Sequence, residues 1–145
     1  MASINAYINF LGNCEEAFNY YKSVFGGEFT MLNRFSEMPP QEGMELPEEH
    51  LNKIMHVSLP VGEHTVLMGS DTGGDWAAKT VVGNNITISI TADTKDQADG
   101  FFSSLSDGGT VIMPMNQTFW GSYFGMCTDK FAINWMISFG QSMEK

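Results

Sequence analysis

The sequence repeats one pattern of residues twice, and this repetition constrains the fold more than any single motif does. Three short segments of the first half align with three of the second half at spacings of 80, 81 and 82 residues. The aligned pairs are Phe10–Asn13 with Ile90–Asp93, Tyr20-Tyr21 with Phe101-Phe102, and Gly26-Gly27 with Gly108-Gly109. A repeat of this kind indicates that the chain contains two copies of one structural unit.

Each copy is expected to hold one strand, one helix and three further strands. Capping boxes predict the helix starts, at Asn13 with Glu16 and at Thr94 with Gln97, and the glycine pairs end the helices. Apolar alternation predicts strands 3–11, 28–35, 54–59 and 65–70 in the first copy and 85–92, 110–115, 119–128 and 132–139 in the second. The last two strands are rich in aromatic residues and meet at a turn at Asp129-Lys130.

Length and composition favour one domain with a shared core. The chain has 145 residues and is 43% hydrophobic, which is enough to bury a sizeable core, whereas neither half is large enough alone. The predicted fold class is α+β, with tandem βαβββ modules at about 3–70 and 84–139 within a single domain 1–145.

The charge balance excludes several classes of partner. Seventeen acidic and seven basic side chains give a net charge of −10. Nucleic acids and anionic membranes both require clustered Lys and Arg, so neither is an expected partner. The chain shows no signal peptide and no apolar run of the ~20 residues that span a bilayer. Two cysteines, Cys14 and Cys127, make no disulfide framework and predict free thiols, so the expected location is the cytoplasm.

Residues 36–50 form the longest predicted loop, with five glutamates. Such a loop is either a solvated connection or a lid over a pocket. A second, shorter loop is expected at 71–75.

Motifs along the whole chain resemble a known family. The matching segments are Phe10–Ala17, Tyr21–Gly27, Met55-His56, Val66–Asp71, Gly109–Pro114, Phe119–Gly121, Asp129–Phe131 and Trp135–Ile137. They resemble the PhnB-like branch of the vicinal oxygen chelate superfamily, which also contains glyoxalase I, extradiol dioxygenases and bleomycin-resistance proteins. The resemblance implies a curved mixed sheet around a cavity, and a homodimer. Many PhnB-like proteins are labelled 3-demethylubiquinone-9 3-methyltransferase. The sequence shows no Gly-rich turn between a parallel strand and a helix, so a methyltransferase is not expected.

The resemblance also implies where a metal would bind. In the superfamily four His or Glu side chains hold a divalent ion. The corresponding positions here are Ala6, a residue near Met68, Thr87 and Met136, which are poor ligands for hard or borderline ions. No cofactor is therefore predicted, and a divalent metal (Zn, Ni, Mn or Fe) is the alternative. Members of this branch often have an acidic residue at the positions of Gln117 and Ser122, and Gly at the position of Ala132. Any role of those acidic residues is therefore not expected here.

His56 is the candidate catalytic residue, because imidazole titrates near neutral pH. The alternative is a histidine that is hydrogen-bonded within the sheet. A three-residue turn after its strand would place His56 on the same face as Met68, and a two-residue turn would place it on the other face. His50 and His64 are expected to be solvated.

A second group of residues is expected to line an apolar cavity with a few polar contacts. These candidate ligand-binding residues are Ser58, Met68, Ser70, Asp71, Thr87, Trp120, Tyr123, Phe124 and Trp135. The alternative for the polar residues is an exposed strand face, and for the aromatic residues it is the core or a dimer interface.

Three functions remain open from the sequence. The first is a PhnB-like protein that binds a small, planar or apolar molecule and has no assigned reaction. The second is a metal-dependent lyase, isomerase or dioxygenase of the glyoxalase type. The third is a drug-sequestering protein of the bleomycin-resistance type.

Overall fold

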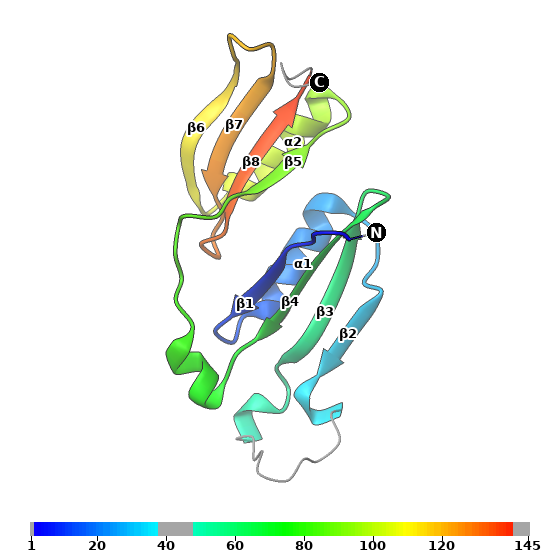
Figure 1. Ribbon diagram of the computed structural model, residues 1–145, viewed down its shortest axis with the longest axis vertical. Coiled ribbons are helices and arrows are strands. Elements are labelled where there is room, and N and C mark those ends of the chain that lie inside the picture. The colour runs from blue at the N-terminus through cyan, green and yellow to red at the C-terminus, as the bar shows by residue number, and fades with distance from the viewer. Residues whose placement is uncertain (1, 38–47, 141–145) are drawn as a thin grey trace. The chain divides into compact units, whose positions relative to one another are not determined.

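The computed structural model describes residues 2–37 and 48–140, and the chain divides into two units, residues 1–81 and 82–145. Each unit contains one four-stranded mixed sheet and one α-helix (Figure 1). The α+β class predicted from the sequence is confirmed. The proposal that both halves form a single domain stays a prediction.

The first unit pairs its strands in the order β1-β4-β3-β2. β1 is parallel to β4, and the other neighbours are antiparallel. Its elements are β1 (Tyr7–Phe10), α1 (Cys14–Phe25), β2 (Met31–Arg34), β3 (Ile54–Val61), β4 (Thr65–Asp71) and the 3₁₀ turns Phe35–Glu37, Glu48–His50 and Gly74–Lys79. The expected loop at 71–75 is thus partly wrong, because β4 continues to Asp71 and a 3₁₀ turn begins at Gly74. Most of the loop predicted at 36–50, either a solvated connection or a lid, lies at 38–47, outside the described residues.

The second unit repeats this arrangement with the order β5-β8-β7-β6. Its elements are β5 (Ile88–Thr91), α2 (Lys95–Ser106), β6 (Thr110–Gln117), β7 (Tyr123–Thr128) and β8 (Asn134–Phe139). The equal strand orders agree with the internal repeat of the sequence. None of the helices within the described ranges is long and apolar enough to cross a membrane.

The core of the first unit lies between α1 and one face of its sheet. Ala17, Phe18 and Tyr21 are fully buried on the helix. Gly69 of β4 lets the helix approach closely, because a Cβ there would lie 2.6 Å from a ring carbon of Phe18. Full burial of an aromatic side chain stabilises the fold by roughly 1.5–3 kcal/mol, so this contact contributes substantially to the packing of α1 on the sheet.

The aromatic strands near the C-terminal end are shorter than predicted. Thr118 folds the chain into a turn, since its backbone N–H and its hydroxyl both bond the carbonyl oxygen of Ser122, at 2.8 and 2.6 Å. β7 therefore begins at Tyr123 rather than at residue 119. The turn between β7 and β8 is also longer than expected, and Ala132 adopts a positive φ of 70° there. Gly adopts that conformation without the strain that a Cβ brings.

The two helices begin in different ways. Thr94 accepts a hydrogen bond from the backbone N–H of Gln97 at 3.0 Å, as its capping box predicts. Asn13 makes no side-chain cap, so the capping box predicted there is wrong. The carboxylate of Asp71 acts at the start of α1 instead, where it accepts hydrogen bonds from the backbone N–H groups of Gly12 and Cys14 at 3.0 and 2.9 Å.

Substitution at the two cap positions should separate these helix starts. Thr94→Ala removes a side-chain cap and is expected to lower the free energy of unfolding by about 1 kcal/mol. Asn13→Ala, the matched control, removes no cap and should change it by only a few tenths of a kcal/mol. Urea denaturation followed by circular dichroism measures both, and equal losses would contradict this account.

Candidate functional site

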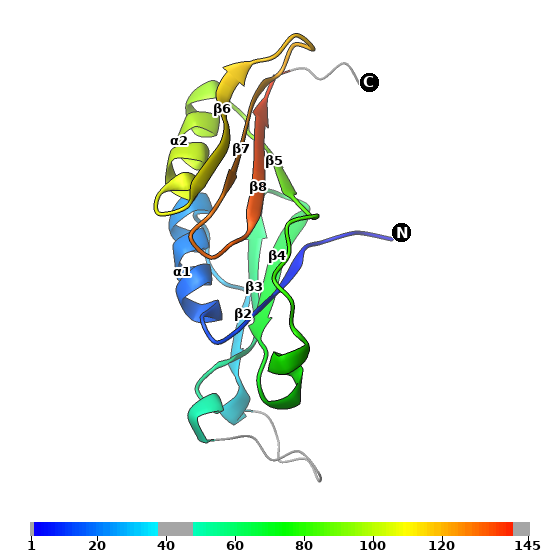
Figure 2. The same ribbon diagram turned by 90° about the vertical axis from the view of Figure 1, so that its left-hand side faces the viewer.

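One face of the first sheet gathers several of the candidate residues. α1 covers the other face (Figure 2), so strand alternation leaves every second side chain of the sheet facing away from the helix. Strand pairing aligns these side chains in two rows, which we call the open face: Tyr7, Met68, Ser58 and Met31 in one row, and Asn9, Ser70, His56 and Asn33 in the other.

The turn between β3 and β4 decides the orientation of His56. Val61 pairs with Thr65, so the turn has three residues, Gly62–His64. The sequence left open whether this turn has two or three residues. The observed three-residue turn places His56 on the same face as Met68. In the observed register, Ser58 lies directly opposite Met68, and His56 lies two residues away from Ser58 on β3.

His56 is held at both ring nitrogens. Nε2 lies 2.9 Å from the Ser58 hydroxyl, and Nδ1 lies 3.3 Å from the Tyr7 hydroxyl. The Tyr7 and His56 rings are 5.6 Å apart between centroids. The three side chains form a continuous hydrogen-bonded chain, which we call the Tyr7–His56–Ser58 chain. Its exposed end is Tyr7, at 46% exposure, and its buried end is Ser58, at 8%.

The other open-face residues frame this chain. Ser70 donates a hydrogen bond to Asn9 at 3.3 Å, and Met68 lies between Tyr7 and Ser58 in its row. Sequence reasoning did not single out Tyr7, Asn9 or Asn33 as site residues. The available signal was alternation: Tyr7 and Asn9 fall on the polar side of the first predicted strand.

Asp71 lies on the side of the sheet that faces α1 and does not belong to the open face. Its carboxylate is buried, and it accepts a third backbone hydrogen bond from Ile54 at 2.9 Å, in addition to those from Gly12 and Cys14. The expected ligand-binding role is therefore corrected to a structural one, because three backbone N–H groups already occupy these oxygens.

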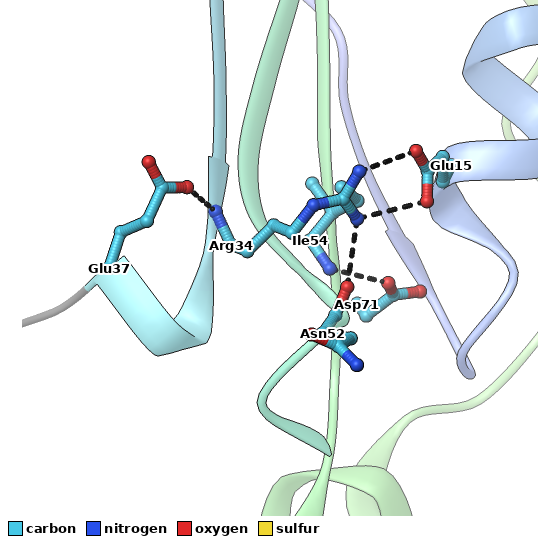
Figure 3. A network of polar contacts seen from close by, with 6 residues as sticks. All are labelled: Glu15, Arg34, Glu37, Asn52, Ile54 and Asp71. Carbon is cyan, nitrogen blue, oxygen red and sulfur yellow. Dashed lines mark hydrogen bonds and ion pairs between the residues drawn. The ribbon is translucent and has the colours of Figure 1, made fainter. Parts of the chain in front are cut away.

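A polar hollow of about 490 Å³ lies beside Asp71 in the same unit. Its lining residues are Gly12, Glu15, Arg34, Glu49, Asn52, Lys53, Ile54 and Asp71. Figure 3 shows the contacts within it: the Arg34 guanidinium donates to both carboxylate oxygens of Glu15, at 2.9 and 2.6 Å, and to the Asn52 carbonyl at 2.9 Å. This hydrogen-bonded Arg34 lowers the pKa of Glu15. The basic groups of the hollow already bind protein acceptors, since Lys53 donates to the Gly12 carbonyl at 2.8 Å.

The aromatic candidates of the second unit separate into different environments. Phe124 lies on the face of its sheet opposite α2, and Trp120 packs edge-on against it with centroids 5.9 Å apart. Tyr123 lies on the α2 side, where its hydroxyl donates to Asp99 at 2.5 Å. Trp135 is 1% exposed and donates its indole N–H to Asp129 at 2.7 Å.

Only part of the expected aromatic site is therefore assembled in this unit. The expected stacking role of Trp135 is corrected to a core role, because its ring is inaccessible. Tyr123 is partly exposed on the α2 side, where its hydrogen bond to Asp99 raises its pKa, and its contact with a ligand stays a prediction. Trp120 and Phe124 remain as partly exposed apolar candidates, and Thr87 lies half-buried just before β5.

The positions that correspond to the superfamily's metal ligands do not suit a divalent metal. Ala6 offers only its carbonyl oxygen, which accepts the backbone N–H of Met68 at 3.0 Å. Met136 and Met68 carry thioethers, which prefer soft ions, and Thr87 is a weak ligand. Residues 2–37 and 48–140 contain no group of three His, Cys, Asp or Glu side chains that could hold an ion.

The remaining histidines and thiols lie outside the open face. His64 is exposed, as expected, but His50 is buried against Phe35 with ring centroids 4.3 Å apart, so the expectation that it is solvated is wrong. Burial raises the pKa of Cys14, and it raises the pKa of Cys127 to about 11. Neither thiol is therefore suited to act as a nucleophile near neutral pH.

Comparison with known proteins places this geometry in a family. Residues 2–138 match the family model described as 3-demethylubiquinone-9 3-methyltransferase. Protein PA1353 from Pseudomonas aeruginosa is 35% identical, with 98% of this chain and 100% of that chain covered and a TM-score of 0.81.

Two further solved structures share the fold at lower identity. A putative 3-demethylubiquinone-9 3-methyltransferase, PhnB protein, from Bacillus cereus is 21% identical, with a TM-score of 0.73 and coverage of 96% of this chain and 100% of its own. A glyoxalase/bleomycin resistance protein/dioxygenase family enzyme from Burkholderia phytofirmans PsJN is 16% identical, with a TM-score of 0.59 and coverage of 94% and 98%.

Replacement of the buried carboxylate should test the structural role of Asp71. Asp71→Asn exchanges one acceptor oxygen for an NH₂ group, so at least one of the three backbone N–H groups loses its partner. The expected loss in free energy of unfolding is about 2 kcal/mol. Asp107→Asn, at an exposed position, is the control and should be close to neutral. Urea denaturation measures both, and a loss below about 0.5 kcal/mol for Asp71→Asn would contradict the structural role.

The Glu15–Arg34 pair should contribute stability only above acidic pH. Because the folded pKa of Glu15 is lowered, its contribution is present above the ordinary Glu pKa of about 4.3 and disappears as the pH falls through the folded value. Both side chains are partly exposed, so Glu15→Gln should cost at most about 0.5–1 kcal/mol at pH 7 and close to nothing at pH 2.5. Glu16→Gln removes the same charge from the same helical turn and serves as the control. A cost for Glu15→Gln that is the same at both pH values would refute the pairing.

Proposed function

Because this chain belongs to the PhnB-like family described as 3-demethylubiquinone-9 3-methyltransferase, and shares the glyoxalase/bleomycin resistance fold, we propose that it binds a small, flat, largely apolar molecule on the open face. The observation that carries this proposal is the composition of that face. Tyr7 and Met31 expose apolar surface there, at 46% and 49%, next to the polar groups of His56 and Ser58. Apolar surface of this kind beside convergent polar groups is a feature of small-molecule sites.

The proposal concerns binding and assigns no reaction. The family's descriptive name refers to methyl transfer, and a fold or family name does not transfer a reaction to a chain. In the first unit, the start of α1 after parallel strand β1 is where an anionic cofactor group would bind a helix N-terminus. Here the carboxylate of Asp71 accepts the N–H groups of Gly12 and Cys14, so these two donors are already occupied.

The methionines suit a ligand that is recognised mainly by shape. Met68 is half-buried at the centre of its row and Met31 lies at the row's outer end. Thioether side chains adapt their conformation to irregular apolar surfaces. A flat ring that packs against Met68 would also contact the exposed side of Tyr7, whose hydroxyl is hydrogen-bonded to the imidazole of His56.

A charge placed at the centre of the row should abolish binding. Met68→Asp sets a carboxylate under the ligand, so the affinity of any flat apolar ligand should fall at least about tenfold. Ser103→Asp adds the same charge at an exposed position of α2 and is the matched control. Ligand titrations followed by backbone amide shifts measure the affinity and locate the ligand. The shifts should concentrate in β1, β3 and β4, and shifts confined to the second unit would refute this location.

Metal dependence is measured in parallel. The purified chain is dialysed against Zn, Ni, Mn or Fe(II), and the bound ion per chain is quantified together with the change in Tm. The donor types at the corresponding positions predict no stoichiometric binding and no shift in Tm. About one ion per chain with a clear rise in Tm would favour a glyoxalase-type, metal-dependent enzyme instead.

A further inference from the structure

We propose that the Tyr7–His56–Ser58 chain recognises an oxygen acceptor, a carbonyl or phenolate oxygen, on the bound molecule through the hydroxyl hydrogen of Tyr7. This inference rests on the proposed binding at the open face and specifies the chemistry of the ligand. Within it Tyr7 touches the ligand, whereas His56 and Ser58 are positioning residues that act through Tyr7.

The Tyr7–His56–Ser58 chain spans three neighbouring strands. Tyr7 comes from β1 and His56 from β3, and β4 lies between them, so the tyrosine side chain crosses β4 to reach the imidazole. His56 and Ser58 are two residues apart on one strand and therefore point to the same face. These contacts hold the imidazole in place, with Nδ1 3.3 Å from the Tyr7 hydroxyl and Nε2 2.9 Å from the Ser58 hydroxyl.

The number of hydrogens on the imidazole and the two hydroxyls determines which end of the Tyr7–His56–Ser58 chain can donate a hydrogen bond to a ligand. A neutral imidazole has one N–H and one acceptor nitrogen, so the two hydroxyls must bond it in opposite senses. If Nε2 carries the hydrogen, the Ser58 hydroxyl hydrogen is left over at the buried end, where an unmet donor costs about 1–3 kcal/mol. If Nδ1 carries it, Ser58 donates to Nε2, Nδ1 donates to the Tyr7 oxygen, and the hydrogen left over belongs to exposed Tyr7.

The second arrangement presents one oriented donor to a ligand. The tyrosine oxygen accepts from His56, so its own hydrogen points away from the imidazole and toward the space above the face. Complete transfer of that hydrogen would leave a phenolate on Tyr7, and a carbonyl oxygen is too weakly basic to bring this about. The chain is therefore suited to donate a hydrogen bond and to hold it in place, and its ligand must supply the acceptor.

A matched pair of probes tests this donor. 1-Indanone and indane have the same bicyclic carbon skeleton and differ in one carbonyl oxygen. One additional hydrogen bond should make 1-indanone bind about fivefold more tightly than indane. Tyr7→Phe keeps the ring, and it should abolish this preference while it leaves the affinity for indane unchanged. Ser103→Ala, at an exposed position of α2 outside the open face, is the control and should keep the preference.

Side-chain NMR tests the positioning residues without any ligand. Long-range ¹H–¹⁵N spectra of the three histidines should show His56 as the Nδ1–H tautomer, with His56→Phe used to assign its signals. Ser58→Ala removes the donor to Nε2 and should shift His56 toward a mixture of tautomers, and Ser103→Ala should not.

The outcomes separate this inference from the proposed function. Equal binding of both probes, or a preference that survives in Tyr7→Phe, would overturn the inference and leave binding at the open face intact. A His56 that is the Nε2–H tautomer would also overturn it. Failure of both probes to shift any amide of β1, β3 or β4 would overturn the proposed binding face together with the inference.

Discussion

The first unit depends on one buried carboxylate. Asp71, at the end of β4, accepts backbone N–H groups from Gly12 and Cys14 at the start of α1 and from Ile54 at the start of β3. It thus joins the central strand to its helix and to a neighbouring strand at one point. These backbone donors are satisfied in a buried setting, where unmet donors would be costly. The contact therefore links the start of α1 and the start of β3 to the end of β4.

The register of β3 against β4 divides the sheet into two chemically different faces. Gly69 and Val57 are paired on the helix side, where Phe18 packs, and their strand neighbours Met68 and Ser58 are paired on the open face. A shift of one residue would send His56 into the core and bring apolar side chains to the surface. The same contacts that stabilise the fold therefore also assemble the polar chain through His56.

The two copies of the repeat share strand order and have diverged in their use of buried acids. In the first unit Asp71 joins separate elements. In the second, Asp129 organises a local turn, where it accepts from Phe131 and Ile133, and it also binds the indole of Trp135. The corresponding faces differ as well, since His56 lies on the first sheet whereas methionine and phenylalanine, at Met126, Met136 and Phe124, occupy the second. Duplication thus preserved the backbone arrangement, and substitution gave each face its own chemistry.

The sequence by itself determined the number, type and order of the elements, because periodic apolar residues, Thr94 and the glycine pairs act locally. It left the face of His56 open, since that depends on the pairing of Val61 with Thr65. It placed the start of α1 correctly but predicted a side-chain cap at Asn13 that the structure does not have. It also assigned Asp71 and Trp135 to a ligand site, since charge and aromaticity alone do not reveal burial. Only the tertiary structure brought Tyr7 within hydrogen-bonding distance of His56, 49 positions away in the chain. Contacts between strands so distant in sequence depend on register and packing, which no local pattern of residues encodes.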